Sequence, residues 1–245
     1  MCLAIVKPAG KTVPEEHLRN GFDGNPDSAG IAYADNGAIG TVKTFGIEKL
    51  IESYYEYEHL PMLIHFRLAT HGAKDEKNCH PFVFNKGRLA AIHNGIINIQ
   101  STKDQSDTSM FIERVLEPVS KRMSLWHPSV KFLVEQSIGN YNKIAVMDGN
   151  GETMIFNESA GHWVDGVWYS NTGYKETSIY LAGWNSRRNW KNKKNFGALQ
   201  RWDEEREELI NQYVTAGYSM AEAIEQADVD LGEETWNRFD MLDKK

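Results

Sequence analysis

The sequence predicts a globular α+β protein, with strands and interspersed helices over roughly the first two-thirds of the chain. Residues 2–6 (CLAIV) form an apolar run of the length of a buried strand. Asp35-Asn36-Gly37 supplies the positive φ angles that a tight hairpin turn needs. Residues 46–58 carry apolar side chains at helical spacing. These three patterns together indicate a mixed fold.

The strands follow from short apolar runs bounded by turn residues. After residues 2–6, a hairpin is expected from residues 28–34 and 38–45. Later strands are expected at 61–68, at 88–93, on both sides of the Gly-rich turn 149–151, around Trp163 and at 167–170.

The helices follow from apolar residues on one face. In residues 46–58 that face holds Ile47, Leu50, Ile51 and Tyr54. The helix expected at 107–120 has Asp107 placed to cap its start and an apolar face of Met110, Phe111, Val115 and Val119. A third helix is expected at 128–138, where Pro128 suits the first turn.

The composition changes after about residue 184. Residues 187–194 (RRNWKNKK) are basic, and the acidic residues 203–208 open a helical stretch to about residue 216. Ser219 with Glu222 makes a capping box for a short helix. We therefore expect a domain at 1–180 and, at 181–245, a basic segment and a C-terminal helical extension. The extension should pack on that domain or on a second copy of the chain, as in a homodimer.

Charge and composition exclude several classes. The 245 residues include 27 Lys+Arg and 34 Asp+Glu, a formal net charge of −7. This acidic balance argues against nucleic acid as the main ligand, because phosphate binding needs a basic surface. No apolar run approaches the roughly 20 residues that span a bilayer, so no membrane association is expected. Two cysteines and no recognisable secretory signal favour a reducing, cytoplasmic setting.

Cys2 follows the initiator Met1, and a small second residue permits removal of Met1. The freed α-amino group has a reference pKa of about 7.7–8.0 and can act as a base near neutral pH. One residue then carries a thiol nucleophile and a general base, and no catalytic histidine is needed. Taken alone, Cys2 is more simply interpreted as a small apolar residue at the start of a strand.

Three further segments carry groups that fit the same chemistry. HFRLATHG holds Arg67, Thr70 and His71, and an arginine offers a bidentate fork to a carboxylate. In HNG, the Asn94 amide and the Gly95 backbone N–H could form a two-donor oxyanion hole. In SDT, Asp107 can receive an α-ammonium group. Together these groups could hold an amino acid and stabilise a tetrahedral intermediate at its side-chain carbonyl.

Taken in order, Cys2, NPDSAG at 25–30, HFRLATHG, NCHPF, HNG and SDT resemble class II glutamine amidotransferases of the N-terminal-nucleophile hydrolase type. The resemblance covers roughly residues 2–175 and is greatest to the stand-alone members. It implies a four-layer αββα sandwich and hydrolysis of glutamine to glutamate and ammonia without a cofactor. Ser28, Ala29 and Leu3 depart from the usual pattern, which affects the expected shape of the site mouth.

Carried over by motif, the resemblance implies a role for each residue. Cys2 would be the nucleophile and its α-amine the base, and Asn94 and Gly95 would form the oxyanion hole. Arg67, helped by Thr70 and His71, would bind the substrate α-carboxylate, and Asp107 would bind the α-ammonium group. A γ-glutamyl thioester would form and be hydrolysed by water.

Other interpretations of the same residues remain open at this point. His65, His71, Cys79, His80 and His93 could suggest zinc, but their spacing fits no common zinc motif, so no metal is expected. Cys79 with His93 and Asn94 could suggest a protease, although a buried thiol beside His80-Pro81 fits better. Residues 187–194 could contact single strands or a partner enzyme, but a solvated surface is favoured. Trp163, Trp168 and Trp202 are expected to be packing aromatics.

The leading hypothesis is a glutaminase that supplies ammonia to a separate synthetase. The first alternative is a hydrolase of another γ-glutamyl amide that transfers no ammonia. The second is a glutamine-binding module that regulates a partner, although such a module would not need a nucleophile.

Overall fold

The structure is a computed structural model, and it describes residues 2–68, 76–99 and 105–175 together with Leu209, Gln212, Ala216 and Gln226. The chain divides into two compact units, Met1–Ser178 and Ile179–Lys245. The first unit holds the three long described ranges. In the described part of the chain, no helix combines the length and the apolar composition needed to cross a bilayer.

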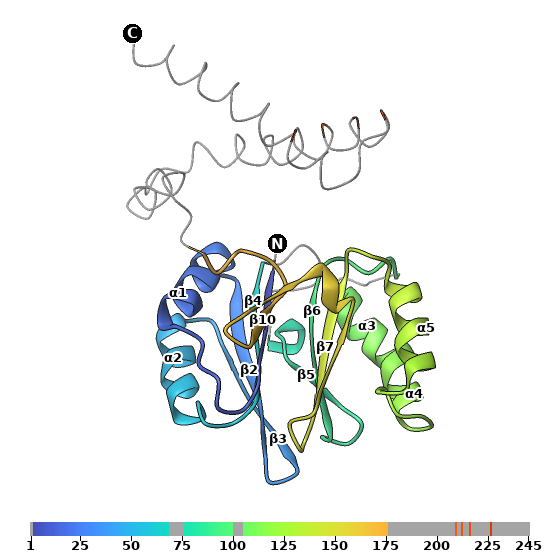
Figure 1. Ribbon diagram of the computed structural model, residues 1–245, viewed down its shortest axis with the longest axis horizontal. Helices are drawn as coiled ribbons and strands as arrows, with labels where there is room; N and C mark the ends of the chain where they lie inside the picture. Colours follow the sequence, from blue (N-terminus) through green and yellow to red (C-terminus); the bar gives the residue numbers. More distant parts are fainter. Residues whose placement is uncertain are drawn as a thin grey trace. The chain divides into compact units, whose positions relative to one another are not determined.

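Two antiparallel sheets form the centre of the first unit (Figure 1). The first has six strands in the order β3-β2-β4-β1-β10-β9, which are Ala38–Thr44, Ser28–Asp35, Met62–Arg67, Leu3–Lys7, Val167–Tyr169 and His162–Val164. The second has four strands in the order β5-β6-β7-β8, which are Phe82–Phe84, Leu89–Asn94, Lys143–Asp148 and Thr153–Phe156.

Helices cover the outer face of each sheet (Figure 1). The helices α1 (Glu15–Gly24) and α2 (Ile47–Glu56) pack on the first sheet. A continuous helical run of α3 (Asp107–Phe111), a π-helical turn η2 (Ile112–Leu116) and α4 (Glu117–Ser120) packs on the second sheet together with α5 (Pro128–Ile138). Two short 3₁₀ turns, η1 (Glu76–Asn78) and η3 (Glu158–Ala160), complete the described elements.

Side chains that alternate along each strand create three apolar layers. Leu3 and Ile5 of β1 point to α1 and α2, whereas Ala4 and Val6 point to the second sheet. Small residues are frequent between the sheets, where Ala4, Ala32, Ala34, Ala90 and Ala145 are all buried. The expected α+β fold, a four-layer αββα sandwich, is confirmed.

Most expected elements are present, including the hairpin turn, in which Asn36 and Gly37 adopt φ angles of 50° and 83°. Three features differ from expectation. The first is the helix α1, whose helical signal is weakened by Gly21 and Gly24, although Leu18 and Phe22 bury one face. The second is Trp163, which is 48% exposed and is not a core residue, unlike the fully buried Trp168.

The third difference concerns the start of α3. Ser106, not Asp107, is the N-cap residue, since its side chain accepts a hydrogen bond from the Ser109 N–H at 3.3 Å.

Of the C-terminal elements, Leu209, Gln212 and Gln226 are helical, while the basic segment 187–194 and Trp202 lie outside the described residues. The assignment of 1–180 and 181–245 as a glutaminase domain and its extension stays a prediction.

Candidate active site

The strand pattern gathers several predicted site residues at one end of the sandwich, the end where β1 begins (Figure 1). Leu3 pairs with Phe66, so Cys2 lies beside Arg67 at the end of β4. On the second sheet Asn94 pairs with Lys143. Side chains two residues apart on a strand lie on the same face of the sheet. The layer between the sheets holds Leu63 of β4, Ile92 of β6 and Ala145 of β7. By this alternation the same faces also carry Arg67, Asn94 and Lys143.

The backbone of the residue after β4 holds the Cys2 thiol. Cys2 Sγ lies 3.3 Å from the Leu68 backbone nitrogen, which donates to it, and 3.4 Å from the Leu68 carbonyl oxygen. Burial raises the pKa of the Cys2 thiol, although the Leu68 backbone and the positive charge of Arg67 act in the opposite direction. A thiol with a raised pKa is mostly protonated at neutral pH, so its use as a nucleophile requires a base.

Two side-chain amides converge on the Cys2 carbonyl oxygen. Asn94 Nδ2 donates to it at 2.5 Å, and Asn171 Nδ2 donates to it at 2.8 Å. Asn94 is 1% exposed, and its Oδ1 has no hydrogen-bond partner among the described residues. An amide NH₂ group has two hydrogens, so Asn94 can hold Cys2 with one and offer the other to a substrate.

Gly95 lies where no side chain fits. Its φ of +134° is unfavourable for other residues, and a Cβ atom there would lie 2.3 Å from Asn142 Oδ1. Asn142 is fixed in turn, because its Nδ2 donates to the Ile138 carbonyl at 2.7 Å and its Oδ1 accepts from His93 Nε2 at 2.9 Å. The backbone after Asn94 is therefore held close to the end of α5.

The Asp107 carboxylate accepts a hydrogen bond from the segment that follows Gly95. Its Oδ2 accepts from the Ile97 N–H at 2.7 Å, and its Oδ1 accepts from the Thr108 N–H at 2.8 Å. The carboxylate is half-buried and lies in the first turn of α3. It thus links α3 to the Asn94-Gly95 corner, and its binding of an ammonium group stays a prediction.

Three buried histidines lie behind the Cys2 end, namely His65, His80 and His93. His65 Nε2 donates to the His93 carbonyl at 2.8 Å, and the His65 and His80 rings lie 4.0 Å apart. Burial lowers the pKa of all three, that of His65 to about 3. They are neutral at pH 7, and within the described residues no group of three or more His, Cys, Asp or Glu side chains could hold a metal ion. Cys79 is buried and is not bonded in a disulfide.

Two residues of this end are not predicted by the sequence. Asn171 follows β10, and its contact with Cys2 depends on the pairing of β10 with β1, which no local pattern reveals. Lys143 begins β7, and strand alternation places it on the same face as Ala145 and Met147. The alternation of side chains along the strand is the sequence signal that could have identified Lys143 as a residue of this end. Thr70 and His71 lie outside the described residues.

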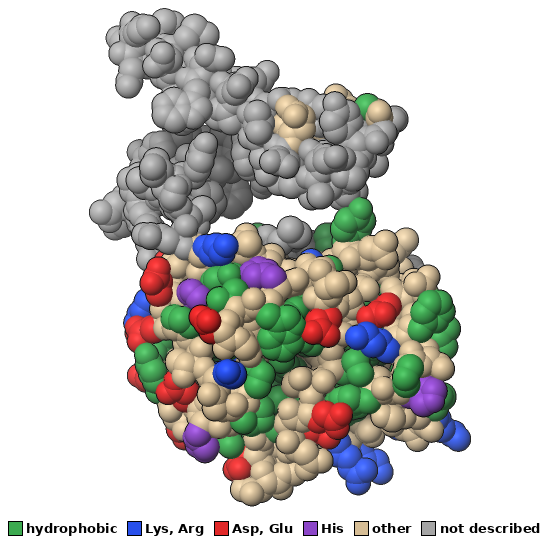
Figure 2. Space-filling model, viewed as in Figure 1, with side chains coloured by type: hydrophobic (Ala, Val, Ile, Leu, Met, Phe, Trp, Pro, Cys, Tyr) green, Lys and Arg blue, Asp and Glu red, His purple; other side chains and the backbone are tan. Residues whose placement is uncertain are grey.

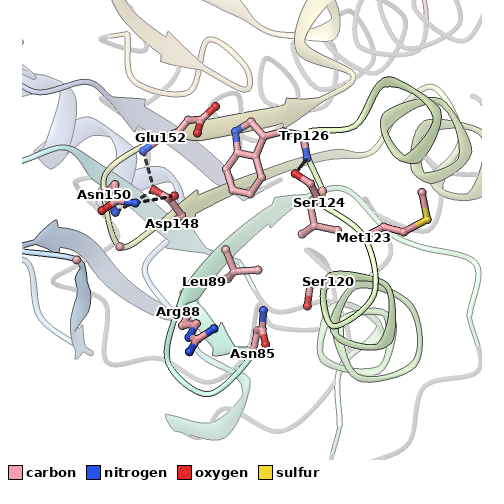
Figure 3. A pocket seen from close by; sticks show the side chains of 13 residues that line it. Asn85, Arg88, Leu89, Ser120, Met123, Ser124, Trp126, Asp148, Asn150 and Glu152 are labelled. Atoms are coloured by element: carbon pink, nitrogen blue, oxygen red, sulfur yellow. Dashed lines mark hydrogen bonds between the residues drawn. The ribbon is translucent and has the colours of Figure 1, made fainter.

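A cavity of about 590 Å³ lies at the opposite end of the β6–β7 pair, where Leu89 pairs with Asp148 (Figure 3). It is lined by turn residues that include Asn85, Arg88, Trp126, Asp148 and Glu152. None of the predicted site residues lines it. On the face of the first unit seen in Figure 2, acidic and basic side chains are interspersed, and the described residues there form no extended basic surface.

The described residues at the Cys2 end of the sandwich have an arrangement that is typical of one class of protein. A cysteine at the start of a central strand meets an Asn-Gly corner on the facing sheet, within a four-layer sandwich. This arrangement agrees with the N-terminal-nucleophile hydrolases that the motifs resemble.

Comparison of the sequence with known proteins shows which proteins this chain is similar to. The glutamine–fructose-6-phosphate aminotransferase (isomerizing) of Synechocystis sp. is 40% identical over 84 residues, which are 32% of this chain and 13% of that protein. The protein of the same name from Sulfolobus acidocaldarius is 31% identical over 144 residues, 53% of this chain and 24% of that protein. These relatives confirm the resemblance to class II glutamine amidotransferases.

The chain spans about a quarter or less of the length of these two relatives. Among solved structures, the glutamine phosphoribosylpyrophosphate amidotransferase from B. subtilis, complexed with ADP and GMP, is similar with a TM-score of 0.47 and 15% identity, over 71% of this chain and 42% of that one. No protein-family model matches the chain.

Proposed function

We propose that this chain is a glutaminase of the class II amidotransferase type, which releases ammonia and glutamate from glutamine. The observation that carries the proposal is the contact between Cys2 and Asn94, which are 92 residues apart in the chain and joined by a 2.5 Å hydrogen bond. A nucleophile and an amide donor that meet across two sheets are the two parts that acyl transfer needs.

The proposed reaction begins with loss of Met1, which frees the α-amine of Cys2. This amine takes the thiol proton while Sγ attacks the γ-carbonyl carbon, and the resulting oxyanion is stabilised by the second Asn94 amide hydrogen and the Gly95 N–H. The amine then gives the proton to the departing nitrogen, so the C–N bond breaks, ammonia leaves and a γ-glutamyl thioester remains. Attack by water, which returns a proton to the thiolate through the same amine, releases glutamate.

Substrate recognition is assigned to the charged groups at the same end. Arg67 is 4% exposed and would pair with the substrate α-carboxylate, and Asp107 would accept the α-ammonium group. Thr70 and His71 are proposed to assist Arg67. The ammonia acceptor is proposed to be a separate synthetase.

The test is a product assay with a matched pair of proteins. Wild type and Cys2→Ala are incubated with glutamine, and glutamate and ammonia are measured, while intact mass reports whether Met1 is present. We expect glutamate and ammonia in equal amounts from wild type without Met1, and no turnover from Cys2→Ala. Cys2→Ala turnover near the wild-type rate would remove Cys2 as the nucleophile, and an inactive wild type without Met1 would remove the proposal.

A further inference from the structure

We infer that Lys143 is a substrate-specificity residue, which binds an acidic group on the leaving amine, so that the chain, besides glutamine, also hydrolyses γ-glutamyl amides of amino acids and prefers them to amides whose amine carries an uncharged substituent. This inference rests on the proposed function and names a substrate class for the same site.

The position of Lys143 follows from the register of the second sheet. Asn94 and Lys143 are directly paired, and the Cβ atoms of such a pair lie about 5 Å apart on one face. Ala145 and Met147 belong to the layer between the sheets, whereas Ile144 and Val146 belong to the outer layer. Lys143 therefore begins on the inter-sheet side, beside the residue that holds Cys2.

The ammonium group of Lys143 is partly removed from water without compensation. Burial lowers the pKa of Lys143, and its Nζ has no hydrogen bond or ion pair among the described residues. Lys7 is a useful contrast, because its buried Nζ donates to the Leu60 carbonyl at 2.8 Å and to the Pro8 carbonyl at 3.3 Å. A half-buried cation that lacks such acceptors is a ready partner for an anion from outside the chain.

The two cations at this end act on different groups. The positive charge of Arg67 lowers the pKa of the Cys2 thiol, and that of Lys143 lowers the pKa of His93. Contacts and pairings give the order Arg67, Cys2, Asn94 and Lys143. A γ-glutamyl compound has its α-carboxylate, γ-carbonyl and leaving amine in the same order. With the α-carboxylate at Arg67 and the carbonyl at Asn94, a substituent on the amine comes next to Lys143.

Glutamine has no group to occupy this position, because its leaving nitrogen carries only hydrogens. A γ-glutamyl amino acid carries a carboxylate two bonds beyond that nitrogen, within reach of a lysine side chain. Binding energy from a part of the substrate that does not react can be used to orient the reacting carbonyl.

The test compares γ-glutamylglycine with γ-glutamylglycinamide, which differ only in the charge of the terminal group. For wild type we expect kcat/KM to be about tenfold or more higher for γ-glutamylglycine, as one charge-assisted contact predicts. Lys143→Met should bring the ratio close to one, and Lys143→Arg should keep most of it. Lys49→Met, at an exposed position of α2, serves as the control and should keep the wild-type ratio.

The outcomes separate the two proposals. Equal kcat/KM for the two amides with wild type, or an equal fall for both in Lys143→Met, would overturn the role of Lys143 in specificity; the second result would indicate an electrostatic effect on the reaction itself. No turnover of glutamine or of either amide by wild type without Met1 would overturn the proposed function. Thermal unfolding of each variant confirms that it is folded.

Discussion

The two ends of the β6–β7 pair show what distinguishes a candidate site from a cavity. At the Asn94–Lys143 end, polar contacts join residues far apart in the chain: Cys2 meets Asn94 and Asn171, which are 92 and 169 residues away. At the Leu89–Asp148 end, the cavity is lined by turns whose polar groups bond to near neighbours, as Asp148 Oδ1 does with the Asn150 and Glu152 N–H groups (Figure 3).

This difference has a physical cause. A local turn contact forms wherever the chain turns, so it implies nothing about function. Buried polar groups brought together from distant segments cost free energy unless each is satisfied, and such an arrangement is expected mainly where chemistry needs it. The Cys2 end meets this description, and the cavity at the Leu89–Asp148 end does not.

After the complete loss expected for Cys2→Ala, the largest expected effect is at Asn94. Asn94→Ala removes one oxyanion donor and one contact to Cys2, and kcat for glutamine should fall by about 10²–10³, as in comparable sites. Steady-state kinetics of the variant measures the loss. A change of less than threefold would show that Asn94 is not aimed at the oxyanion.

Asn171 offers an isosteric test of how the nucleophile is held. Asn171→Asp keeps the oxygen that accepts from the Gly173 N–H at 2.9 Å but replaces the donor to the Cys2 carbonyl with a second oxygen. We expect kcat to fall by about tenfold to a hundredfold with KM nearly unchanged, because the part-buried Cys2 carbonyl loses one of its donors, at a cost of about 1–3 kcal/mol. An increase in KM alone would assign Asn171 to substrate binding instead.

The buried histidines predict acid sensitivity at the Cys2 end. Their folded pKa values are lowered, so the unfolded chain, with a histidine pKa of about 6.5, binds more protons as the pH falls. Their contribution to stability is complete above about pH 6.5 and is lost progressively below it; for His65, whose folded pKa is about 3, the loss at pH 5 is about 2 kcal/mol.

Urea unfolding at pH 7.5 and pH 5 measures this loss. His65→Gln should make the difference between the two pH values smaller, whereas His59→Gln, at an exposed position, should leave it as in wild type. Equal pH dependence in wild type and His65→Gln would contradict the assignment.

The smallest effect is expected at the cavity end. Arg88→Ala and Trp126→Phe change two lining residues that lie at the other end of the strands from Cys2. The kcat/KM for glutamine should change by less than twofold in both. A tenfold loss in either variant would mean that the two ends are coupled and that the cavity end also serves the reaction.

The sequence allows prediction of those features that local patterns encode. Asn36-Gly37 marks its hairpin, a short apolar run before a Gly-rich turn marks β7, and motif resemblance makes Cys2, Asn94 and Arg67 the candidate site residues. The helix α1 escapes prediction because its ten residues include two glycines and only one short apolar stripe. Asn171 could not be found, since its role depends on β10 pairing with β1, where Ile5 lies opposite Tyr169. Contacts set by register between distant strands leave no mark in a single sequence.

The close fit of Gly95 against Asn142 constrains how this chain can evolve. An alanine at 95 would meet the Asn142 side-chain oxygen, and Asn142 also anchors His93 and the end of α5. Neither position can drift independently, because a neutral path from one pair of residues to another must pass through a clash or through an unpaired buried histidine. Among homologues, the two positions should therefore be inherited as a unit, and the Asn-Gly corner should diverge more slowly than the cavity turns.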